Sequence, residues 1–156
     1  MATSPADSVF VDANILIYAR QAHSPFHQAA LSKLAALALA GRTLWTSRQV
    51  LREYLAGMSR PSLTAAPPPM ASLIADVRFF VTKFIVVEDG PTVTHHLLDL
   101  LSAIPCFGKQ VHDANIVATL LSHGIPMLLT HNVADFTRYG AHITVLPLIP
   151  STKQAT

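Results

Sequence analysis

The chain has 156 residues, of which 51% are hydrophobic and 13% are charged, and its formal net charge is +2. This hydrophobic content is ample for one compact domain with a sizeable core, and it argues against intrinsic disorder. The weak positive charge permits contact with nucleic acid without predicting it, because no run of Lys or Arg forms a basic arm.

The cysteine content and the length of the apolar segments indicate the cellular compartment. The single cysteine, Cys106, excludes an internal disulfide, which suits a reducing environment. No charge-free apolar segment approaches the roughly 18 residues of a membrane span, and the N-terminus lacks the basic and then apolar regions of a signal peptide. We therefore expect a cytoplasmic protein with no membrane association.

The first half of the chain alternates apolar or β-branched runs with helical patterns. In chain order we expect a strand at residues 9–11, a helix at 14–20, a helix from 25 to about 40, a strand at 43–46 and a helix from 48 to about 58. Ser24 and Pro25 suit the cap and the first position of the second helix, and Gly41 is placed to stop it. Ser47 suits the cap of the third helix.

The second half continues the alternation after a proline-rich segment, residues 61–69, which we expect to be a stiff, exposed loop. Beyond it we expect a helix at 70–83, a strand at 84–87, a helix from 91 or 92 to about 104, a helix at 112–123 and strands at 127–130 and 143–146. This pattern predicts a parallel sheet covered by helices on both faces. Residues 1–150 are expected to form one domain, with residues 151–156 as a loose tail.

Four of the nine acidic residues occupy comparable places in the alternation. Asp12 follows the first strand, Glu53 lies in the helix after the second, Asp113 opens a late helix and Asp135 follows the fourth strand. In a parallel α/β sheet such positions converge on one edge. Clustered carboxylates bind a cation or take up protons unless Lys or Arg neutralises them, and oxygen ligands favour Mg²⁺ or Mn²⁺. The pattern therefore predicts a metal-dependent phosphodiester hydrolase.

Each carboxylate also has a structural alternative. Asp12 and Asp113 could only cap the helices that follow them, and Glu53 could be a solvated residue of an amphipathic helix, although Val50 and Gly57 on the same helix face predict apolar or small surroundings. The remaining acidic residues are assigned to the surface: Asp7, Asp76, Glu88, Asp89 and Asp99.

Polar residues next to the acidic positions could assist them. Asn14 and Asn115 each stand two residues after an aspartate, where their amides could orient a carboxylate or a water, or only start a helix. The hydroxyl of Thr130 ends a strand and could support a ligand or satisfy local backbone groups.

The four carboxylates lie in four segments, in chain order VDANILIYA, SRQVLREYL, KQVHDANIVATLL and LLTHNVADF. Together these segments resemble the motifs of PIN-domain ribonucleases, and above all the VapC-type toxins of bacterial toxin–antitoxin operons. The resemblance extends from residue 9 to about residue 146.

This resemblance implies a fold and an activity: a three-layer α/β/α sandwich with a mainly parallel central sheet, and an endoribonuclease that depends on Mg²⁺ or Mn²⁺. The resemblance implies that Asp12, Glu53 and Asp113 are metal ligands. It also implies that Asp135 corresponds to the acidic residue of the last motif. Thr130 and Asn132 match polar positions that line the site. Some family members have an acidic residue at the position of Asn132, so Asp135 could contact metal only through water.

The resemblance also implies partners: an RNA substrate, a second copy of the chain in a homodimer, and an antitoxin whose C-terminal segment occludes the site. Two alternatives stay open. One is a PIN nuclease of RNA maturation or decay, and the other is a catalytically inactive RNA-binding or scaffold module.

Basic residues near the motifs are candidates for holding RNA phosphates, with ordinary solvated faces as the alternative; they are Arg20, Arg48, Arg52, Lys109 and Arg138. The eight histidines contain neither an HExxH motif nor a pair spaced four residues apart on a helix, so a zinc site is not expected. His112 and His131 flank the acidic positions and could contact substrate or be structural.

Overall fold

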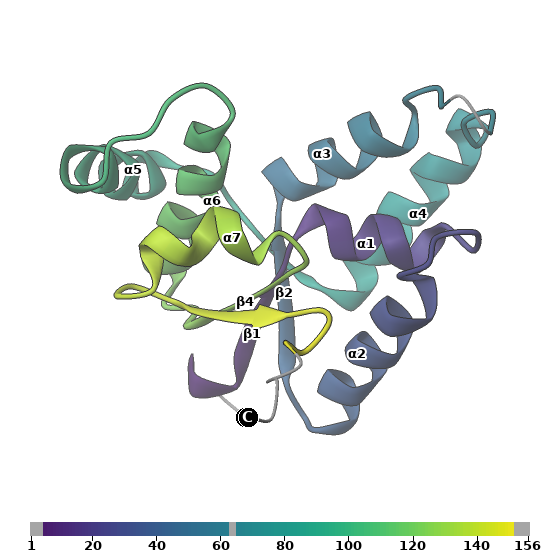
Figure 1. The fold of residues 1–156 in the computed structure, drawn as a ribbon, viewed down its shortest axis with the longest axis horizontal. Coiled ribbons are helices and arrows are strands. Elements are labelled where there is room, and N and C mark those ends of the chain that lie inside the picture. The colour runs from purple at the N-terminus through teal and green to yellow at the C-terminus, as the bar shows by residue number, and fades with distance from the viewer. Residues whose placement is uncertain (1–4, 63–64, 152–156) are drawn as a thin grey trace.

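The structure is a computed structural model that describes residues 5–62 and 65–151. Its strands form one fully parallel sheet in the order β3-β2-β1-β4-β5 (Figure 1). The strands are β1 (Ser8–Val11), β2 (Thr43–Ser47), β3 (Ile85–Val87), β4 (Met127–Thr130) and β5 (Thr144–Pro147). The helices are α1 (Ala13–Arg20), α2 (His27–Leu39), α3 (Arg48–Met58), α4 (Met70–Lys83), α5 (Pro91–Ala103), α6 (Gln110–His123) and α7 (Val133–Phe136).

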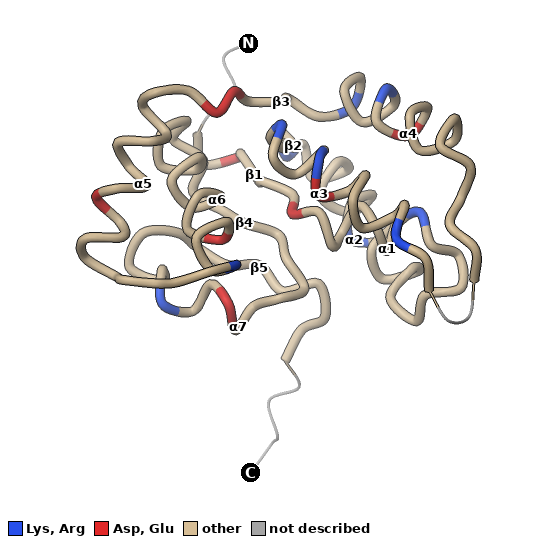
Figure 2. The backbone as a smooth tube through the Cα atoms, turned by 90° about the horizontal axis from the view of Figure 1, so that it is seen from above, with Lys and Arg blue, Asp and Glu red and all other residues tan. Residues whose placement is uncertain are grey.

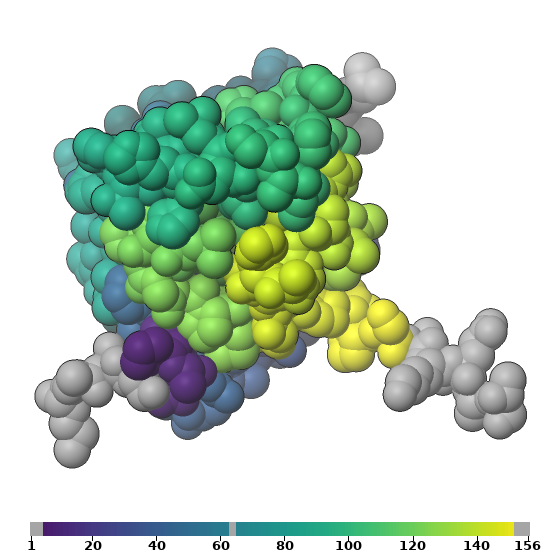
Figure 3. Space-filling view, turned by 90° about the vertical axis from the view of Figure 1, so that its left-hand side faces the viewer, coloured from purple at the N-terminus to yellow at the C-terminus, as the bar shows by residue number. Residues whose placement is uncertain are grey.

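The helices cover the sheet from two sides. Figure 1 shows α1 to α4 on one side of the sheet and α5 to α7 on the other. Right-handed crossovers explain this division, because the chain steps from β1 through β2 to β3 in one direction and then returns to β4 and β5 in the other. Figure 3 shows the second side, where α5 lies beside the last third of the chain. The predicted α/β/α fold around a parallel sheet is confirmed.

The central strand β1 positions the site. All four of its residues are buried, as expected of a parallel strand with a neighbour on each side. Connections from β1 lead to β2 on one side, whereas β4 and β5 lie on the other, so the strand order reverses between β1 and β4. In open α/β sheets this switch point, at the carboxyl ends of the strands, is where ligands bind. Asp12 directly follows β1, and Thr130 ends β4.

Two helix starts differ by two residues from the sequence-based expectation, and α1 begins one residue early, at Ala13. Helix α2 begins at His27 rather than Pro25, because the Ser24 hydroxyl accepts a hydrogen bond from the Phe26 backbone N–H (3.2 Å) in a preceding turn. Helix α6 begins at Gln110, two residues before the expected start. Asp113 is therefore its fourth residue and does not cap it. The short helix α7 and the 3₁₀ turns Pro5–Asp7 and Thr137–Tyr139 were not predicted.

The assignment of Asp76 to the surface is wrong. This residue is only 8% exposed, and its carboxylate accepts a hydrogen bond from the Tyr54 hydroxyl (2.6 Å) and forms an ion pair with Arg20 (2.5 Å). Because α1, α3 and α4 each contribute one member, the cluster joins three helices on one side of the sheet. The other four residues assigned to the surface are exposed.

The proline-rich segment is exposed over residues 61–62 and 65–69, as predicted, and residues 63–64 lie outside the described part of the chain. Residues 152–156 of the expected tail also lie outside it, and the assignment of residues 1–150 to one domain stays a prediction. No described helix combines the length and apolar character needed to cross a bilayer.

Candidate active site

Asp12 caps helix α1 and also faces a cleft. Its side chain is held in a defined orientation: Oδ1 accepts a hydrogen bond from the Ala13 backbone N–H (2.7 Å), and Oδ2 accepts from the Thr130 hydroxyl (2.8 Å) and the Asn14 amide (3.0 Å). A carboxylate offers about four lone-pair directions. These three hydrogen bonds therefore leave about one direction for a ligand.

Asn14 and Thr130 bind each other as well as Asp12. The Thr130 hydroxyl oxygen accepts hydrogen bonds from the Asn14 amide and the Asn132 backbone N–H, both at 3.1 Å. The side-chain oxygen Oδ1 of Asn14 accepts a hydrogen bond from the backbone N–H of His131 (2.9 Å). These contacts join the segment after β1 to the segment after β4. The structure thus places both residues where they orient the Asp12 carboxylate.

Glu53 and Asp113 approach the same cleft from α3 and α6. The cleft has a volume of about 570 Å³, and Asp12, Glu53 and Asp113 all line it. The Glu53 oxygen Oε1 accepts a hydrogen bond from the Gln49 amide (2.7 Å), whereas no described residue donates a hydrogen bond to the Asp113 side chain. The three residues are more than 40 positions apart in the chain, and the switch point brings them together.

Burial and mutual repulsion raise the pKa values of two of these carboxyl groups. Burial is the main cause for Asp12, whose pKa rises to about 6 although the hydrogen bonds from Thr130 and Ala13 oppose the shift. The pKa of Asp113 also rises to about 6, chiefly through burial and to a smaller extent through the charges of Asp135, Asp12 and Glu53. The carboxylates therefore act on one another as a single cluster.

No described cation pairs with this cluster. The ion pairs among the described residues join Arg20 to Asp76, Arg42 to Asp7 and Arg48 to Glu88. A buried carboxylate without a partner is costly, so a group of them is expected to take up a cation or protons.

Asp135 lies at the margin of the cluster. It is exposed in α7 and does not line the cleft, whereas Asn132 does. Its charge nevertheless contributes to the raised pKa of Asp113. Asp135 is therefore close enough to act on the cluster, but it is further from the cleft than the other three acidic residues.

The donor set suits a hydrated magnesium or manganese ion. Within residues 5–62 and 65–151, no three His, Cys, Asp or Glu side chains lie close enough to one another to hold a metal ion together. Mg²⁺ commonly keeps several waters and is held by one or two carboxylates together with substrate phosphate. The carboxylates lining the cleft are compatible with that mode.

Only one of the five basic residues proposed from the sequence lines the cleft, namely Lys109. Arg20 pairs with Asp76, and Arg48 makes two short hydrogen bonds to Glu88 at an exposed position. The other two are exposed outside the lining, Arg52 on α3 and Arg138 after α7. Figure 2 shows most Lys and Arg positions on the half of the molecule that contains α1 to α4.

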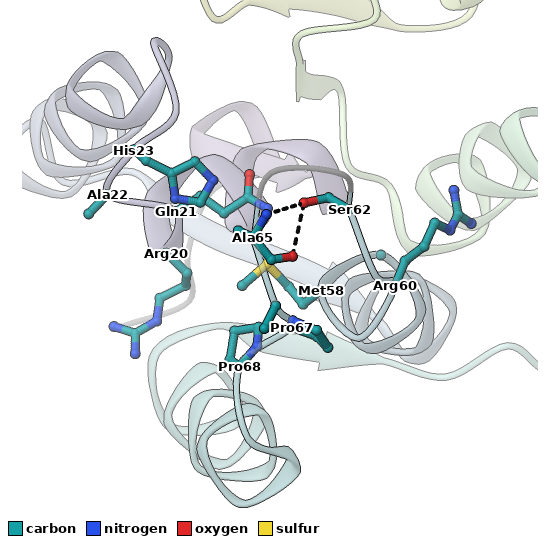
Figure 4. A pocket seen from close by; sticks show the side chains of 12 residues that line it. Arg20, Gln21, Ala22, His23, Met58, Arg60, Ser62, Ala65, Pro67 and Pro68 are labelled. Carbon is teal, nitrogen blue, oxygen red and sulfur yellow. Dashed lines mark hydrogen bonds between the residues drawn. The ribbon is translucent and has the colours of Figure 1, made fainter.

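Arg60 lines the cleft but was not identified from the sequence, because it follows the end of α3 and belongs to no motif. It also borders an adjoining hollow of about 310 Å³, and Figure 4 shows its side chain pointing out of that hollow. Gly57 lines both spaces. A Cβ there would lie 2.8 Å from Ile17 Cδ1, so glycine permits the close approach of α3 to α1.

Gln49 and His112 complete the surroundings of Glu53. Gln49 is four residues before Glu53, a spacing at which side chains of a helix contact each other. The sequence alone could therefore have indicated this hydrogen-bonded pair. His112 lines the cleft at an exposed position, whereas His131 packs edge-on against Tyr18 and contacts the Phe26 ring.

Comparisons with known proteins agree with this architecture. A family model described as the PIN domain matches residues 9–141. Ribonuclease VapC24 of Mycobacterium tuberculosis is 28% identical over 134 residues, which are 83% of this chain and 90% of that protein.

Two solved structures illustrate the likeness of fold. VapBC2 from Rickettsia felis, bound to a DNA fragment from its promoter, has a TM-score of 0.65 at 18% identity, with 90% of this chain and 98% of that chain covered. VapC20 of Mycobacterium tuberculosis, a toxin that cleaves the sarcin–ricin loop, has a TM-score of 0.58 at 17% identity, with 77% and 86% covered.

Proposed function

The chain belongs to the PIN domain family, and from this premise we propose that it is an endoribonuclease that depends on Mg²⁺ or Mn²⁺. One observation carries the proposal. Asp12, Glu53 and Asp113 line one cleft at the switch point of the sheet, and no described Lys or Arg forms an ion pair with them. The ribonuclease name of the relative that is 28% identical supports the same reaction class.

In this proposal the cation is held by Asp12, Asp113 and Glu53, directly or through water, and Asp135 adds negative charge from the margin. When bound, a divalent cation stabilises negative charge on a phosphate oxygen and lowers the pKa of water. The hydrogen bonds from Thr130 and Asn14 keep the Asp12 carboxylate oriented before any ligand arrives, so little reorganisation accompanies binding.

The cleft also offers positive groups for the RNA backbone. Lys109 precedes α6 and Arg60 follows α3, and both line the cleft at exposed positions. They would bind phosphates next to the scissile bond, which supplies affinity without sequence preference. Arg20 and Arg48 are already paired with acidic residues and are less suited to that role. Arg52 and Arg138 would contact only RNA that extends beyond the cleft.

We further propose that the protein is the toxin of a toxin–antitoxin pair, acting in the cytoplasm, as a homodimer and with a cognate antitoxin that blocks the cleft. The similarity to VapC24 and the fold shared with VapBC2 support this assignment. VapC20 cleaves the sarcin–ricin loop, so ribosomal RNA is a suitable first substrate.

Cleavage of RNA by the purified protein tests the activity. We expect cleavage with Mg²⁺ or Mn²⁺, none with EDTA, and severe loss in Asp12→Asn and Asp113→Asn. Gln28→Met is a control, because Gln28 is exposed on α2 and bonds only to Ser32 of its own helix among the described residues. Undiminished cleavage in EDTA, or in both aspartate variants, would refute the metal mechanism.

Expression in cells separates the proposed toxin from the two alternatives. A toxin is expected to arrest growth, and co-expression of the small DNA-binding protein encoded by a neighbouring reading frame should restore growth. Cleavage without growth arrest would instead favour a nuclease of RNA maturation or decay. RNA binding without cleavage at any metal concentration would favour an inactive module.

A further inference from the structure

Gln49 is a buried polar residue beside the acidic cleft that the proposed reaction does not use. It is the second residue of α3, and it is only 7% exposed. Buried amides are nearly always hydrogen-bonded, and their partners define their orientation. The partners of Gln49 come from both walls of the cleft.

The amide nitrogen of Gln49 makes two hydrogen bonds. It donates to Oε1 of Glu53 (2.7 Å), one turn further along α3, and to the backbone carbonyl oxygen of His112 (3.0 Å) in the first turn of α6. That carbonyl belongs to the peptide bond that leads directly into Asp113. A single NH₂ group thus contacts the carboxylate of Glu53 and the backbone that carries Asp113.

The amide oxygen of Gln49 has a partner of its own. It accepts a hydrogen bond from the Asn115 amide (2.7 Å), which also donates to Oδ2 of Asp89 (3.2 Å). A flipped Gln49 amide would direct its oxygen at the Glu53 carboxylate and the His112 carbonyl, and its NH₂ group at the NH₂ of Asn115. The relay from Asp89 through Asn115 therefore permits only one orientation.

We propose that Gln49 is a positioning residue that sets the placement of Glu53 relative to Asp113 and so prepares the cleft for a divalent cation. This inference rests on the proposed function, since it concerns the metal site of that reaction. One oxygen of Glu53 is held by Gln49, and no described residue donates a hydrogen bond to the other, Oε2.

The neutrality of the amide matters to this role. Glu53 is one of the negative charges that raise the pKa of Asp113, so the two side chains repel each other. A Lys or Arg at position 49 would hold Glu53 but would also neutralise the charge that attracts a cation. An amide holds the carboxylate and leaves the charge of the cluster in place.

Mn²⁺ binding provides the first test and requires no RNA. We expect Gln49→Met, which keeps the length of the side chain but removes its donors, to weaken Mn²⁺ binding measured by electron paramagnetic resonance by about 10- to 100-fold, the usual effect of losing an outer-shell partner. Gln28→Met makes the same chemical change at an exposed helical position and should bind Mn²⁺ like the wild-type protein.

RNA cleavage provides the second test. For Gln49→Met we expect kcat to fall by about 10- to 100-fold at fixed metal, with KM for RNA changed less than about threefold and partial recovery at high Mn²⁺. A residue that only stabilises the fold would lower the unfolding temperature without changing metal affinity or kcat of the folded protein.

A double-mutant cycle tests the relay. Asn115→Leu should reduce Mn²⁺ affinity in the wild-type background, but by less than about twofold in the Gln49→Met background, because the relay acts through Gln49. If Gln49→Met fails to fold, the Mn²⁺ affinity and kcat of Asn115→Leu are measured in its place.

Wild-type Mn²⁺ affinity and kcat in Gln49→Met, or in Asn115→Leu where that variant stands in, would overturn the inference. If the wild-type protein cleaves no RNA but the Gln49→Met variant still binds Mn²⁺ more weakly, the proposed function is refuted and the positioning role of Gln49 stands.

Discussion

Two buried aspartates of this protein have opposite surroundings. Asp76 is 8% exposed and lies against the Arg20 guanidinium and the Tyr54 hydroxyl, which satisfy its carboxylate. Asp12 is 5% exposed and receives only neutral donors, from Ala13, Asn14 and Thr130.

The difference distinguishes a carboxylate that is satisfied within the fold from one that we propose to bind a cation. A cation of the chain itself balances Asp76, which therefore joins three helices without needing a ligand. The neutral donors around Asp12 orient its charge but do not cancel it, and Glu53 adds repulsion. Burial alone therefore does not indicate a binding site, whereas burial without a counter-charge marks a candidate for one.

The largest expected effect is on catalysis. Asp12→Asn should reduce RNA cleavage by on the order of 10³-fold, about 4 kcal/mol of transition-state stabilisation, because it removes a charge that we propose holds the cation. Asp76→Ala, measured on its folded fraction, should retain wild-type kcat within about threefold. Single-turnover cleavage of one RNA by both variants checks this, and equal losses would remove the distinction between the two aspartates.

The next largest effect is on stability, where the Asp76 variant rather than the Asp12 variant should be affected. Asp76→Ala should lower the free energy of unfolding by about 2 to 3 kcal/mol, because the Tyr54 hydroxyl loses its partner inside the protein while the half-exposed Arg20 is rehydrated. Urea denaturation followed by circular dichroism measures the loss. A change below about 0.5 kcal/mol would show that the cluster does not hold the helices together.

The pH dependence of stability gives a smaller effect. Asp113 has a pKa of about 6 in the folded protein and 3.8 as its ordinary value, so its carboxyl group favours the folded state below pH 3.8, and this contribution is lost as the pH rises through about 6. In EDTA, Asp113→Asn should therefore raise the free energy of unfolding at pH 7.5 by about 1 to 2 kcal/mol, after allowance for its partial exposure.

At pH 4 the same variant should differ little from the wild-type protein. Denaturation curves at both pH values check the sign. RNA cleavage should show the reverse dependence and fall below about pH 6, because protonated carboxyl groups no longer attract the cation. A variant that is less stable than the wild type at pH 7.5 would contradict the repulsion inferred for the cleft.

The smallest effect concerns the exposed ion pair of Arg48 and Glu88, whose side chains are 56% and 67% exposed. Arg48→Gln should leave the free energy of unfolding unchanged within experimental error, since solvent screens such pairs. Thermal unfolding at low and high salt measures it. A loss comparable to that of Asp76→Ala would show that burial is not what distinguishes the two ion pairs.

Local patterns in the sequence determined most of the fold. Helices α3 and α4 and strand β4 have the predicted limits, because apolar spacing, the Ser47 cap and the proline-rich break act within a few residues of each other. The alternation of strands and helices also predicted that the acidic residues after successive strands would meet at one edge, and three of them line the cleft.

Tertiary packing decided which side chains are paired and which are free. The sequence alone did not reveal that Asp76 is buried, that Arg20 forms an ion pair with it, or that Arg60 lines the cleft. It also could not separate Asn132, which lines the cleft, from Asp135, which lies at its margin. These outcomes depend on contacts between elements far apart in the chain, and a carboxylate has the same local sequence signal whether its counter-charge lies beside it or is absent.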